Sequence, residues 1–369
     1  MREALIVSTA RTPIGKAYRG AFNDTTSPTM GGHAIKHAVE RAGIDSAEVE
    51  DVIIGAAIQM GSGFQNVARQ SLIKAGLPDS VAGQSIDRQC SSGMMAIGMA
   101  AKQIISDGMS VAVGGGVESI SMNQTGDMFA IPDPDLLTTK PELYMAMIET
   151  AEIVGERYGV SREAQDEYSA QSQARTATAQ QAGAFDHEMV PLPSVMKLQN
   201  KETGEVNEIE TTLDKDEGNR PGTTAQSLAG LQPVFANGQV IKEGKHVTAG
   251  NASQTSDGAA FVLVVSESII KEYNLNPIAR LASCAVGGVD PLYMGIGPCV
   301  AIPKALNQAG LKLEDIDLIE LNEAFAAQAL AVIQEAKLDP KKVNVNGGAI
   351  APVSYTHLRA HETRGNLVC

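Results

Sequence analysis

Cys90 has the clearest chemical potential in the chain, because it lies where a predicted strand leads into a predicted helix. Residues 88–93 read Arg-Gln-Cys-Ser-Ser-Gly, and a helical pattern follows from Gly93. Free N–H groups and the dipole at a helix N-terminus favour a thiolate. Ser and Gly beside it let backbone amides approach a substrate carbonyl. A small buried cysteine is the alternative, but this turn favours a nucleophile, whereas Cys284 and Cys299 lack such a setting and are expected to be structural.

Three further segments contain residues that can approach a ligand closely. Residues 248–260 are mostly small or hydrogen-bonding and precede a predicted strand. Asn322 and Glu323 follow another predicted strand and open a predicted helix, where an N-cap and a first-turn glutamate would also explain them. Residues 344–350 include a glycine pair that needs a tight backbone path. Each segment alone is weak evidence for a site.

Other common kinds of site are not expected. The glycines at 114–116 lack the following Lys-Ser/Thr of a P-loop, and the glycine segment from Gly61 has Asn66 where a dinucleotide fingerprint has glycine. The six histidines are scattered without a pair at ligand spacing, and the four cysteines have no metal-ligand spacing either. We therefore expect no metal site.

The composition indicates a globular α/β protein in a reducing compartment. Of its 369 residues, 43% are hydrophobic and 20% are charged, and this length predicts two or three domains. The net charge of −14 argues against a general nucleic-acid surface. Four dispersed cysteines do not make a disulfide framework. Since we find neither a signal peptide nor an apolar run long enough for a membrane span, we expect a cytoplasmic location.

Short β-type runs alternate with helical patterns over the first 120 residues. This alternation predicts parallel strands joined by crossover helices. The predicted strands are 4–8, 51–57, 85–86 and 111–114, and the predicted helices are 30–42, 67–75 and 93–107.

The chain contains an internal repeat. Residues 34–50 recur as residues 301–317 without a gap, so that Gly43 recurs as Gly310. A helix, a glycine C-cap, an acidic loop and a strand are thus repeated in one order. Any two βα units could share such a pattern, but the ungapped match favours two related halves. Each half would bring a sheet with helices on its faces, and a shared helical layer would bury both inner faces.

The segment from about residue 123 to 246 breaks the alternation. Residues 145–182 have a helical pattern, and residues 200–220 are acidic with β-like spacing. We interpret this segment as an insertion between strands of the first half, with a separate domain as the alternative.

Taken together, these segments resemble the thiolase family over residues 1–351. The motifs that carry the resemblance occur in family order. They are Ala-Arg-Thr-Pro-Ile-Gly at 10–15, Arg-Gln-Cys-Ser-Ser-Gly at 88–93, Gly-Gly-Val-Glu-Ser at 115–119, Gly-Asn-Ala-Ser at 250–253, Asp-Gly-Ala-Ala at 257–260, Gly-Ile-Gly-Pro at 295–298, Asn-Glu-Ala-Phe at 322–325 and Asn-Gly-Gly-Ala-Ile-Ala at 346–351.

The resemblance implies an α/β fold with a five-layered α-β-α-β-α core of two similar halves and an inserted loop domain. The implied divisions are residues 1–122 with about 251–277 for the N-terminal half, 123–250 for the loop domain, 278–351 for an incomplete C-terminal half and 352–369 for a non-native tail.

The resemblance also implies coenzyme A thioester chemistry. Cys90 would take an acyl group from a 3-ketoacyl-CoA and pass it to free CoA, or run the reverse condensation. Asn322 would hold a water that helps polarise the thioester oxygen, while Ser253 and Arg220 would contact CoA. Without the family, Arg220 is best interpreted as a solvated charge. No cofactor is implied beyond the acyl-CoA and CoA substrates, and the implied assembly is a homodimer or homotetramer.

The motif at 88–93 is more similar to degradative 3-ketoacyl-CoA thiolases of fatty-acid β-oxidation than to enzymes that form acetoacetyl-CoA. An acetyl-CoA acetyltransferase remains the nearest alternative, because a missing methylene is worth only about 1–3 kcal/mol of selectivity. A third hypothesis is a non-catalytic protein of the same fold that binds acyl-CoA. A redox sensor at Cys90 would need a resolving cysteine nearby, and the sequence offers none.

The chain departs from the family pattern after residue 351. Ser354 stands where the family has its catalytic histidine, and the second catalytic cysteine has no counterpart. Losing a positioned base typically costs a factor of about 10²–10⁴ in rate. His357 and His361 lie further along an unrelated tail, and Cys369 lacks the family context. We therefore expect a truncated gene model whose product does not complete turnover.

Overall fold

The computed structural model describes residues 2–126, 130–200, 202–351 and 366–368, and its largest feature is a seven-stranded sheet. The strand order is β4-β3-β5-β8-β1-β9, with β2 paired to β8. The strands are β1 (Leu5–Arg11), β2 (Gly15–Lys16), β3 (Asp51–Gly55), β4 (Ala82–Ile86), β5 (Val111–Ser119), β8 (Ser256–Val265) and β9 (Ala279–Arg280).

This first sheet is mixed, but the strands predicted to be parallel do run in one direction, since β1 and β5 are both antiparallel to β8. β3 is parallel to β4 and β5, as predicted, but β8 is antiparallel to both β5 and β1. A crossover helix imposes a parallel direction on the strand that follows it. β8 instead returns from the long inserted segment, so its direction is not constrained in this way.

Helices cover both faces of the first sheet. They are α1 (Ser27–Ala42), α2 (Val67–Lys74) and α3 (Ser92–Lys102). Successive side chains of a strand point to opposite faces. Val52 and Ile54 of β3 accordingly join the core under α1 and α2, whereas Ile53 joins the core under α3. All three side chains are fully buried, which explains the continuous apolar run of this strand.

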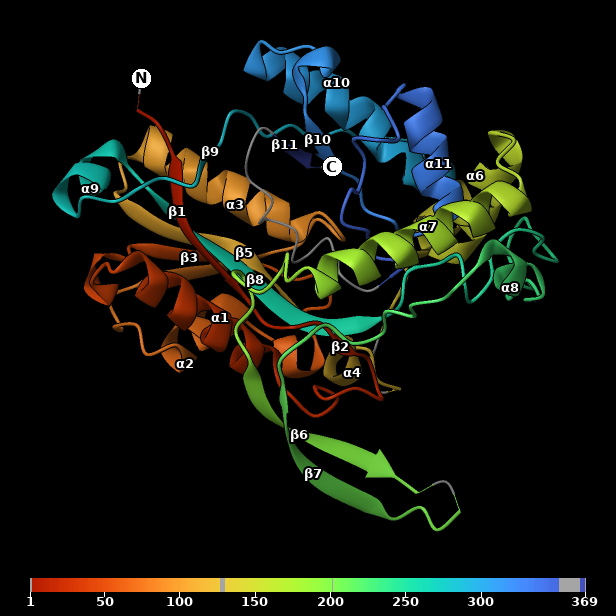
Figure 1. Cartoon of the computed structure of the whole chain (residues 1–369), viewed down its shortest axis with the longest axis horizontal. Helices are drawn as coiled ribbons and strands as arrows, with labels where there is room; N and C mark the ends of the chain where they lie inside the picture. The colour runs from red at the N-terminus through yellow and green to blue at the C-terminus, as the bar shows by residue number, and fades with distance from the viewer. Residues whose placement is uncertain (1, 127–129, 201, 352–365, 369) are drawn as a thin grey trace.

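A smaller second half lies on the far side of α3. Its elements are α10 (Gly297–Ala309), β10 (Leu318–Glu320), α11 (Ala326–Glu335) and β11 (Asn366–Val368). β10 pairs in parallel with β11, and Ile319 forms a parallel bridge with Val343. Figure 1 shows α1 with α2, the first sheet, α3, the strands β10 and β11, and α10 in successive layers, as the predicted five-layered core requires.

The structure confirms the predicted internal repeat. α1 ends at Gly43 and α10 ends at Gly310, and both glycines are left-handed, with φ of 66° and 68°. A 3₁₀ turn follows each helix, at Ser46–Glu48 and at Leu313–Asp315, and then β3 or β10 begins. Each of these features recurs at the spacing found in the sequence.

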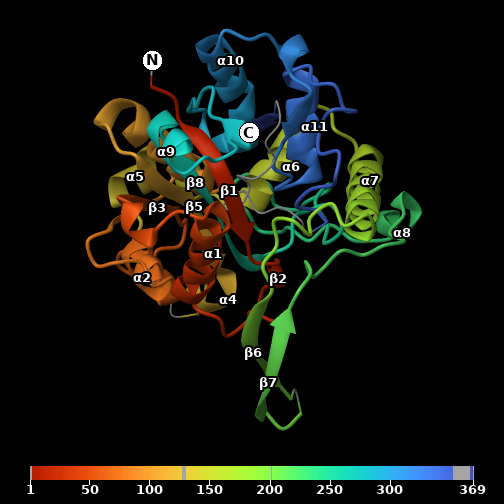
Figure 2. The same ribbon diagram turned by 60° about the vertical axis from the view of Figure 1, so that its left-hand side comes forward.

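The inserted segment contains helices, irregular stretches and a hairpin that projects from the body (Figures 1 and 2). The single helix predicted over 145–182 is two helices, because Gly159 takes a left-handed φ of 64° and Ser161 caps the second helix. The predicted boundaries of this segment stay predictions. Its elements are α4 (Ile120–Asn123), α5 (Pro134–Thr139), α6 (Met147–Arg157), α7 (Arg162–Gln181), β6 (Leu192–Gln199), β7 (Val206–Leu213) and α8 (Ala225–Ala229), and α9 (Glu267–Glu272) follows β8.

A buried ionic cluster fastens the inserted segment to the first sheet. The Arg11 guanidinium at the end of β1 donates to Glu188 at 2.5 Å and to both carboxylate oxygens of Asp216 at 2.7 and 2.9 Å. Burial by itself lowers the pKa of Arg11, but the two carboxylates raise it above its usual value. Arg11 belongs to the motif at residues 10–15, so this motif joins the sheet to the base of the hairpin.

Candidate active site

Cys90 lies in the tight turn between β4 and α3, as predicted. Gln89 takes a left-handed φ of 47°, which is uncommon for a residue with a side chain. The Ser92 hydroxyl accepts a hydrogen bond from the Arg88 N–H at 2.7 Å and donates to the Gln89 carbonyl at 2.6 Å. Cys90 is half-buried directly before the first turn of α3. The turn is therefore held by its own side chains, and the thiol is next to the helix N-terminus.

Two glycines let α3 approach the sheet closely enough to place this turn. A Cβ on Gly55, at the end of β3, would lie 2.2 Å from the Ser92 carbonyl carbon. A Cβ on Gly114 of β5 would lie 2.8 Å from the Ile97 Cα. Both distances are far below van der Waals contact, so side chains here would push the N-terminal half of α3 away from the sheet.

The loops that hold Ser253 and Asn322 are joined through their backbones. The Ser253 N–H donates to the Ala324 carbonyl at 3.0 Å, and the Ala326 N–H donates to the Asn251 carbonyl at 2.9 Å. Ser253 and Asn322 are both half-buried. The structure thus brings together two of the predicted site segments, which are about seventy residues apart in the sequence.

Asn322 and Glu323 do not cap α11, so the alternative interpretation of these two residues was wrong. The helix begins at Ala326 with Phe325 at its N-cap. Glu323 is instead buried and accepts hydrogen bonds from the hydroxyls of Tyr168 and Ser172 on α7, at 2.9 and 2.7 Å. Its carboxylate therefore fixes the Asn322 loop to the inserted segment.

The glycine segment at 344–350 closes against the same carboxylate. The Asn344 amide donates to Glu323 at 2.9 Å, and it also exchanges two hydrogen bonds with the backbone of Leu321. The Ile350 N–H donates to Glu323 at 3.2 Å. A Cβ on Gly348 would lie 2.3 Å from the Glu323 carboxyl carbon, so the tight path expected for the glycines is needed to reach it.

Arg220 is held by its backbone while its side chain is exposed. Its N–H donates to the Gln173 side-chain oxygen at 2.8 Å, and the Gln173 amide donates to the Ile350 carbonyl at 3.0 Å. Ser253, Asn322 and Arg220 are thus connected through α7 and residues 344–350. Cys90 is positioned separately, by β4 and α3. Ser354 lies outside the described residues.

Sequence reasoning missed Glu323 as the centre of this network and missed the buried polar face of α7. A signal for that face was present, because polar side chains recur at helical spacing of three or four residues along α7. The buried members are Gln165, Asp166, Ser169, Ser172, Gln173 and Thr176. A polar stripe of this kind predicts contact with polar loops rather than with an apolar core.

Two buried carboxylates anchor the chain where it leaves the first sheet. Burial raises the pKa of Glu118, which accepts hydrogen bonds from the Ala57 N–H and the Asn123 amide. Burial also raises the pKa of Asp257 to about 6, although hydrogen bonds from Ser121 oppose the shift. These acids stabilise the turn after β5.

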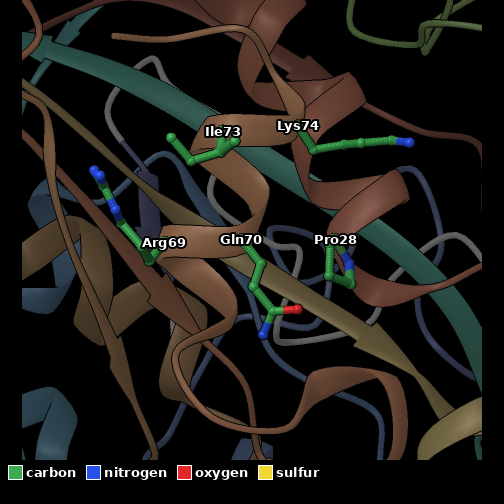
Figure 3. Close-up of a pocket in the computed structure, with 5 residues that line it drawn as sticks. All are labelled: Pro28, Arg69, Gln70, Ile73 and Lys74. Atoms are coloured by element: carbon green, nitrogen blue, oxygen red, sulfur yellow. The ribbon is translucent and has the colours of Figure 1, made fainter. Parts of the chain in front are cut away.

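A shallow hollow of about 590 Å³ lies elsewhere on the surface. Figure 3 shows that its lining comes from the exposed side of α2 and the start of α1. It is on the opposite face of the sheet from α3, so it is separate from Cys90. The lining residues are Pro28, Arg69, Gln70, Ile73 and Lys74.

The described residues form neither a membrane-spanning helix nor a cluster of three or more metal-binding side chains. Over 2–126, 130–200, 202–351 and 366–368, no helix is both long and apolar enough to cross a bilayer. Within the same ranges, no group of three or more His, Cys, Asp or Glu side chains is arranged to hold a metal ion.

Known proteins match nearly the whole chain. The family model "Thiolase, N-terminal domain" matches residues 4–268, and "Thiolase, C-terminal domain" matches residues 275–359. The second match runs past residue 351, so the expectation that the resemblance ends there is not supported.

Curated relatives and solved structures agree with these matches. The chain is 44% identical to a "3-ketoacyl-CoA thiolase" of Bacillus subtilis, over 95% of this chain and 88% of that one, and 42% identical to an "Acetyl-CoA acetyltransferase" of Cupriavidus necator with the same coverage. The crystal structure of human mitochondrial 3-ketoacyl-CoA thiolase superposes with a TM-score of 0.82 at 36% identity, covering 96% of this chain and 89% of that one. The chain therefore belongs to the thiolase family of acyltransferases.

Proposed function

We propose that this protein cleaves 3-ketoacyl-CoA thiolytically through an acyl-enzyme on Cys90. The Cys90 sulfur attacks the 3-keto carbon, the bond between carbons 2 and 3 breaks, and acetyl-CoA leaves after taking up a proton at carbon 2. The thiol of a second CoA then attacks the acyl-enzyme thioester and releases the shortened acyl-CoA. The observation that carries the proposal is the position of Cys90 next to the N-terminus of α3, where the thiolate is favoured.

The other predicted site residues have supporting roles in this proposal. Asn322 holds a water that polarises the thioester oxygen. The buried Glu323, next to Asn322 in the sequence, keeps the Asn322 loop in place. Ser253 contacts CoA from the adjoining loop. The exposed Arg220 offers a positive charge to the CoA phosphates in a chain whose net charge is −14. The family relationship further supports a homodimer or homotetramer, which light scattering measures directly.

The step most affected by the departures of this chain from its family is the deprotonation of Cys90. Ser354 occupies the position of the family's histidine, and a positioned base is typically worth a factor of about 10²–10⁴ in rate. We therefore propose that acylation is slow in this chain. Ser354→His should accelerate transfer of an acetyl group from acetyl-CoA to the protein by roughly that factor, and an unchanged rate would contradict this part of the proposal.

Mass spectrometry of the intact protein after exposure to acetyl-CoA tests the nucleophile. We expect one acetyl adduct that is absent from Cys90→Ser. Cys284→Ser is the matched control, because Cys284 is also half-buried and burial raises the pKa of its thiol. An adduct that persists in Cys90→Ser, or one that disappears in Cys284→Ser, would refute the assignment.

Synthesis of acetoacetyl-CoA by an acetyl-CoA acetyltransferase is the second candidate, because relatives with both names are similarly close. The ratio of rates on acetoacetyl-CoA and on a longer 3-ketoacyl-CoA distinguishes the two. Faster reaction of the longer substrate supports the degradative function. Binding of acyl-CoA without any adduct would instead indicate a non-catalytic acyl-CoA-binding protein.

A further inference from the structure

Two histidines lie side by side on the outer surface of α1. His33 and His37 are four residues apart, so their side chains share one face of the helix. Their ring centroids are 4.6 Å apart with the rings inclined at 68°. The expectation that no two histidines have ligand spacing was wrong for this pair, because residues four apart in sequence become neighbours once the helix forms.

The His33 ring interacts with two backbone carbonyls, those of Pro191 and Val190, and the His37 ring interacts with the Glu40 carboxylate. His33 Nε2 lies 3.1 Å from the Pro191 carbonyl oxygen, and His37 Nδ1 lies 3.3 Å from the Glu40 carboxylate. Both contacts are satisfied when these nitrogens carry the proton and donate it. In a neutral imidazole the other nitrogen then has a free lone pair. Histidines that bind metals almost always donate their second N–H to a carbonyl or carboxylate in this way.

We propose that His33 Nδ1 and His37 Nε2 bind one divalent transition-metal ion of the kind that prefers imidazole, namely Ni²⁺, Cu²⁺ or Zn²⁺. Water completes the coordination. Glu40 and the Pro191 carbonyl orient the two rings and do not bind the ion. With only two ligands from the protein the site is exchangeable, in agreement with the lack of any cluster of three or more metal-binding side chains in the described ranges.

The site is independent of the thiolase chemistry and lies beside the base of the hairpin. Pro191 directly precedes β6, so the His33 ring already connects α1 to this strand. A bound ion would hold both rings in one orientation and would stabilise this junction. Because binding to the folded state alone raises stability by mass action, the effect should depend on the metal concentration.

Calorimetric titration of the full chain with NiCl₂ tests the proposal, since Ni²⁺ does not oxidise thiols as Cu²⁺ does. The double variant His33→Gln/His37→Gln should bind Ni²⁺ at least about tenfold more weakly. His357→Gln/His361→Gln is the matched control, because these histidines have the same spacing in the sequence but lie outside the described residues. The control should bind as the unmodified chain does. Loss of binding in the control instead, or no Ni²⁺ binding to the unmodified chain, would overturn the proposal.

A single substitution tests the same site if the double variant His33→Gln/His37→Gln does not fold. His37→Gln leaves the contact between His33 and Pro191 in place, so the fold should be retained. Ni²⁺ should raise the midpoint of thermal unfolding of the unmodified chain and leave that of His37→Gln unchanged. An equal rise in both proteins would also overturn the proposal.

Discussion

The two copies of the internal repeat have the same local structure but different burial. Nine residues of α1 are buried in the protein interior. In α10, all of whose residues the structure describes, one residue is buried, Ile302. Both helices nevertheless end at a left-handed glycine and continue through a 3₁₀ turn into a strand. α1 lies against a wide sheet and α2, while α10 faces the short strands of the second half (Figure 1).

This difference separates two kinds of information in the repeated sequence. Helix, cap, turn and strand are determined by neighbouring residues, so they recur wherever the pattern recurs. Burial depends on the partners that other parts of the chain supply, and these differ between the halves. The same substitution should therefore have different effects in the two copies when it tests burial, and equal effects when it tests local geometry.

The largest difference should come from a charge placed at a matched core position. Val39→Asp puts a carboxylate where the side chain is buried, and we expect a loss of about 3–5 kcal/mol in the free energy of unfolding. Leu306→Asp, at the equivalent and only partly buried position, should cost about 1–2 kcal/mol. Urea unfolding of the two variants measures this. Equal losses of stability in the two variants would contradict the proposed difference in burial between the two copies of the repeat.

Ion pairs at the ends of one sheet should follow the same rule. Arg11→Ala leaves the buried carboxylates of Glu188 and Asp216 without their cation, which should cost about 3–5 kcal/mol. Arg280→Ala removes an exposed pair with Glu3, also at 2.7 Å, and should cost less than about 1 kcal/mol. Thermal unfolding of the two variants is the measurement, and similar shifts would show that burial does not determine the strength of these pairs.

Removal of the buried carboxylate that organises the second half should also be costly. Glu323→Ala removes a carboxylate that accepts hydrogen bonds from the Tyr168 and Ser172 hydroxyls and the Asn344 amide, so we expect a loss of about 3 kcal/mol in the free energy of unfolding and slower acylation of Cys90. Glu323→Gln keeps one acceptor oxygen and should recover part of both effects. An acylation rate unchanged in Glu323→Ala would mean that this network does not position Asn322.

The first half should contribute a pH dependence through Asp257. Its pKa of about 6 lies above the unfolded value of 3.8, so the native state binds this proton more tightly. The free energy of unfolding should therefore fall, by up to about 3 kcal/mol, as the pH rises from about 4 to about 6. Asp257→Asn should remove this contribution, which comparison of urea unfolding at pH 4.5 and 7 detects. Identical pH profiles for the two proteins would contradict it.

The smallest effect should be the one that is equal in the two halves. Gly43→Ala and Gly310→Ala force a side chain into the left-handed region, and no atom of the part of the chain that the structure describes lies within 4 Å of a Cβ at either position. Each should cost about 1 kcal/mol, since the strain is local. Thermal unfolding curves of the two variants should superimpose. A difference between the two unfolding curves would show that tertiary contacts add strain at one of the two glycine caps.

Much of the fold could be predicted from local patterns, and the features that were missed have two physical causes. The turn at Cys90 and the repeat depend on residues adjacent in sequence, and both were predicted. The antiparallel direction of β8, the break at Gly159 and the role of Glu323 were not, because they depend on packing between distant segments or on the choice between two plausible local conformations. The pairing of the Ser253 loop with the Asn322 loop is of the same kind.

The order of residues alone determined the alternating strands and helices of the first 120 residues, the glycine caps of the repeat, and that a cysteine precedes a helix, since these features follow from interactions within a few residues. Only the tertiary structure decided that Glu323 is a buried acceptor rather than a helix cap, that α7 carries the loops of the site, and that one copy of a repeated helix is buried and the other is not. These outcomes depend on which surfaces meet, and the free energy of burial is set by both partners at once.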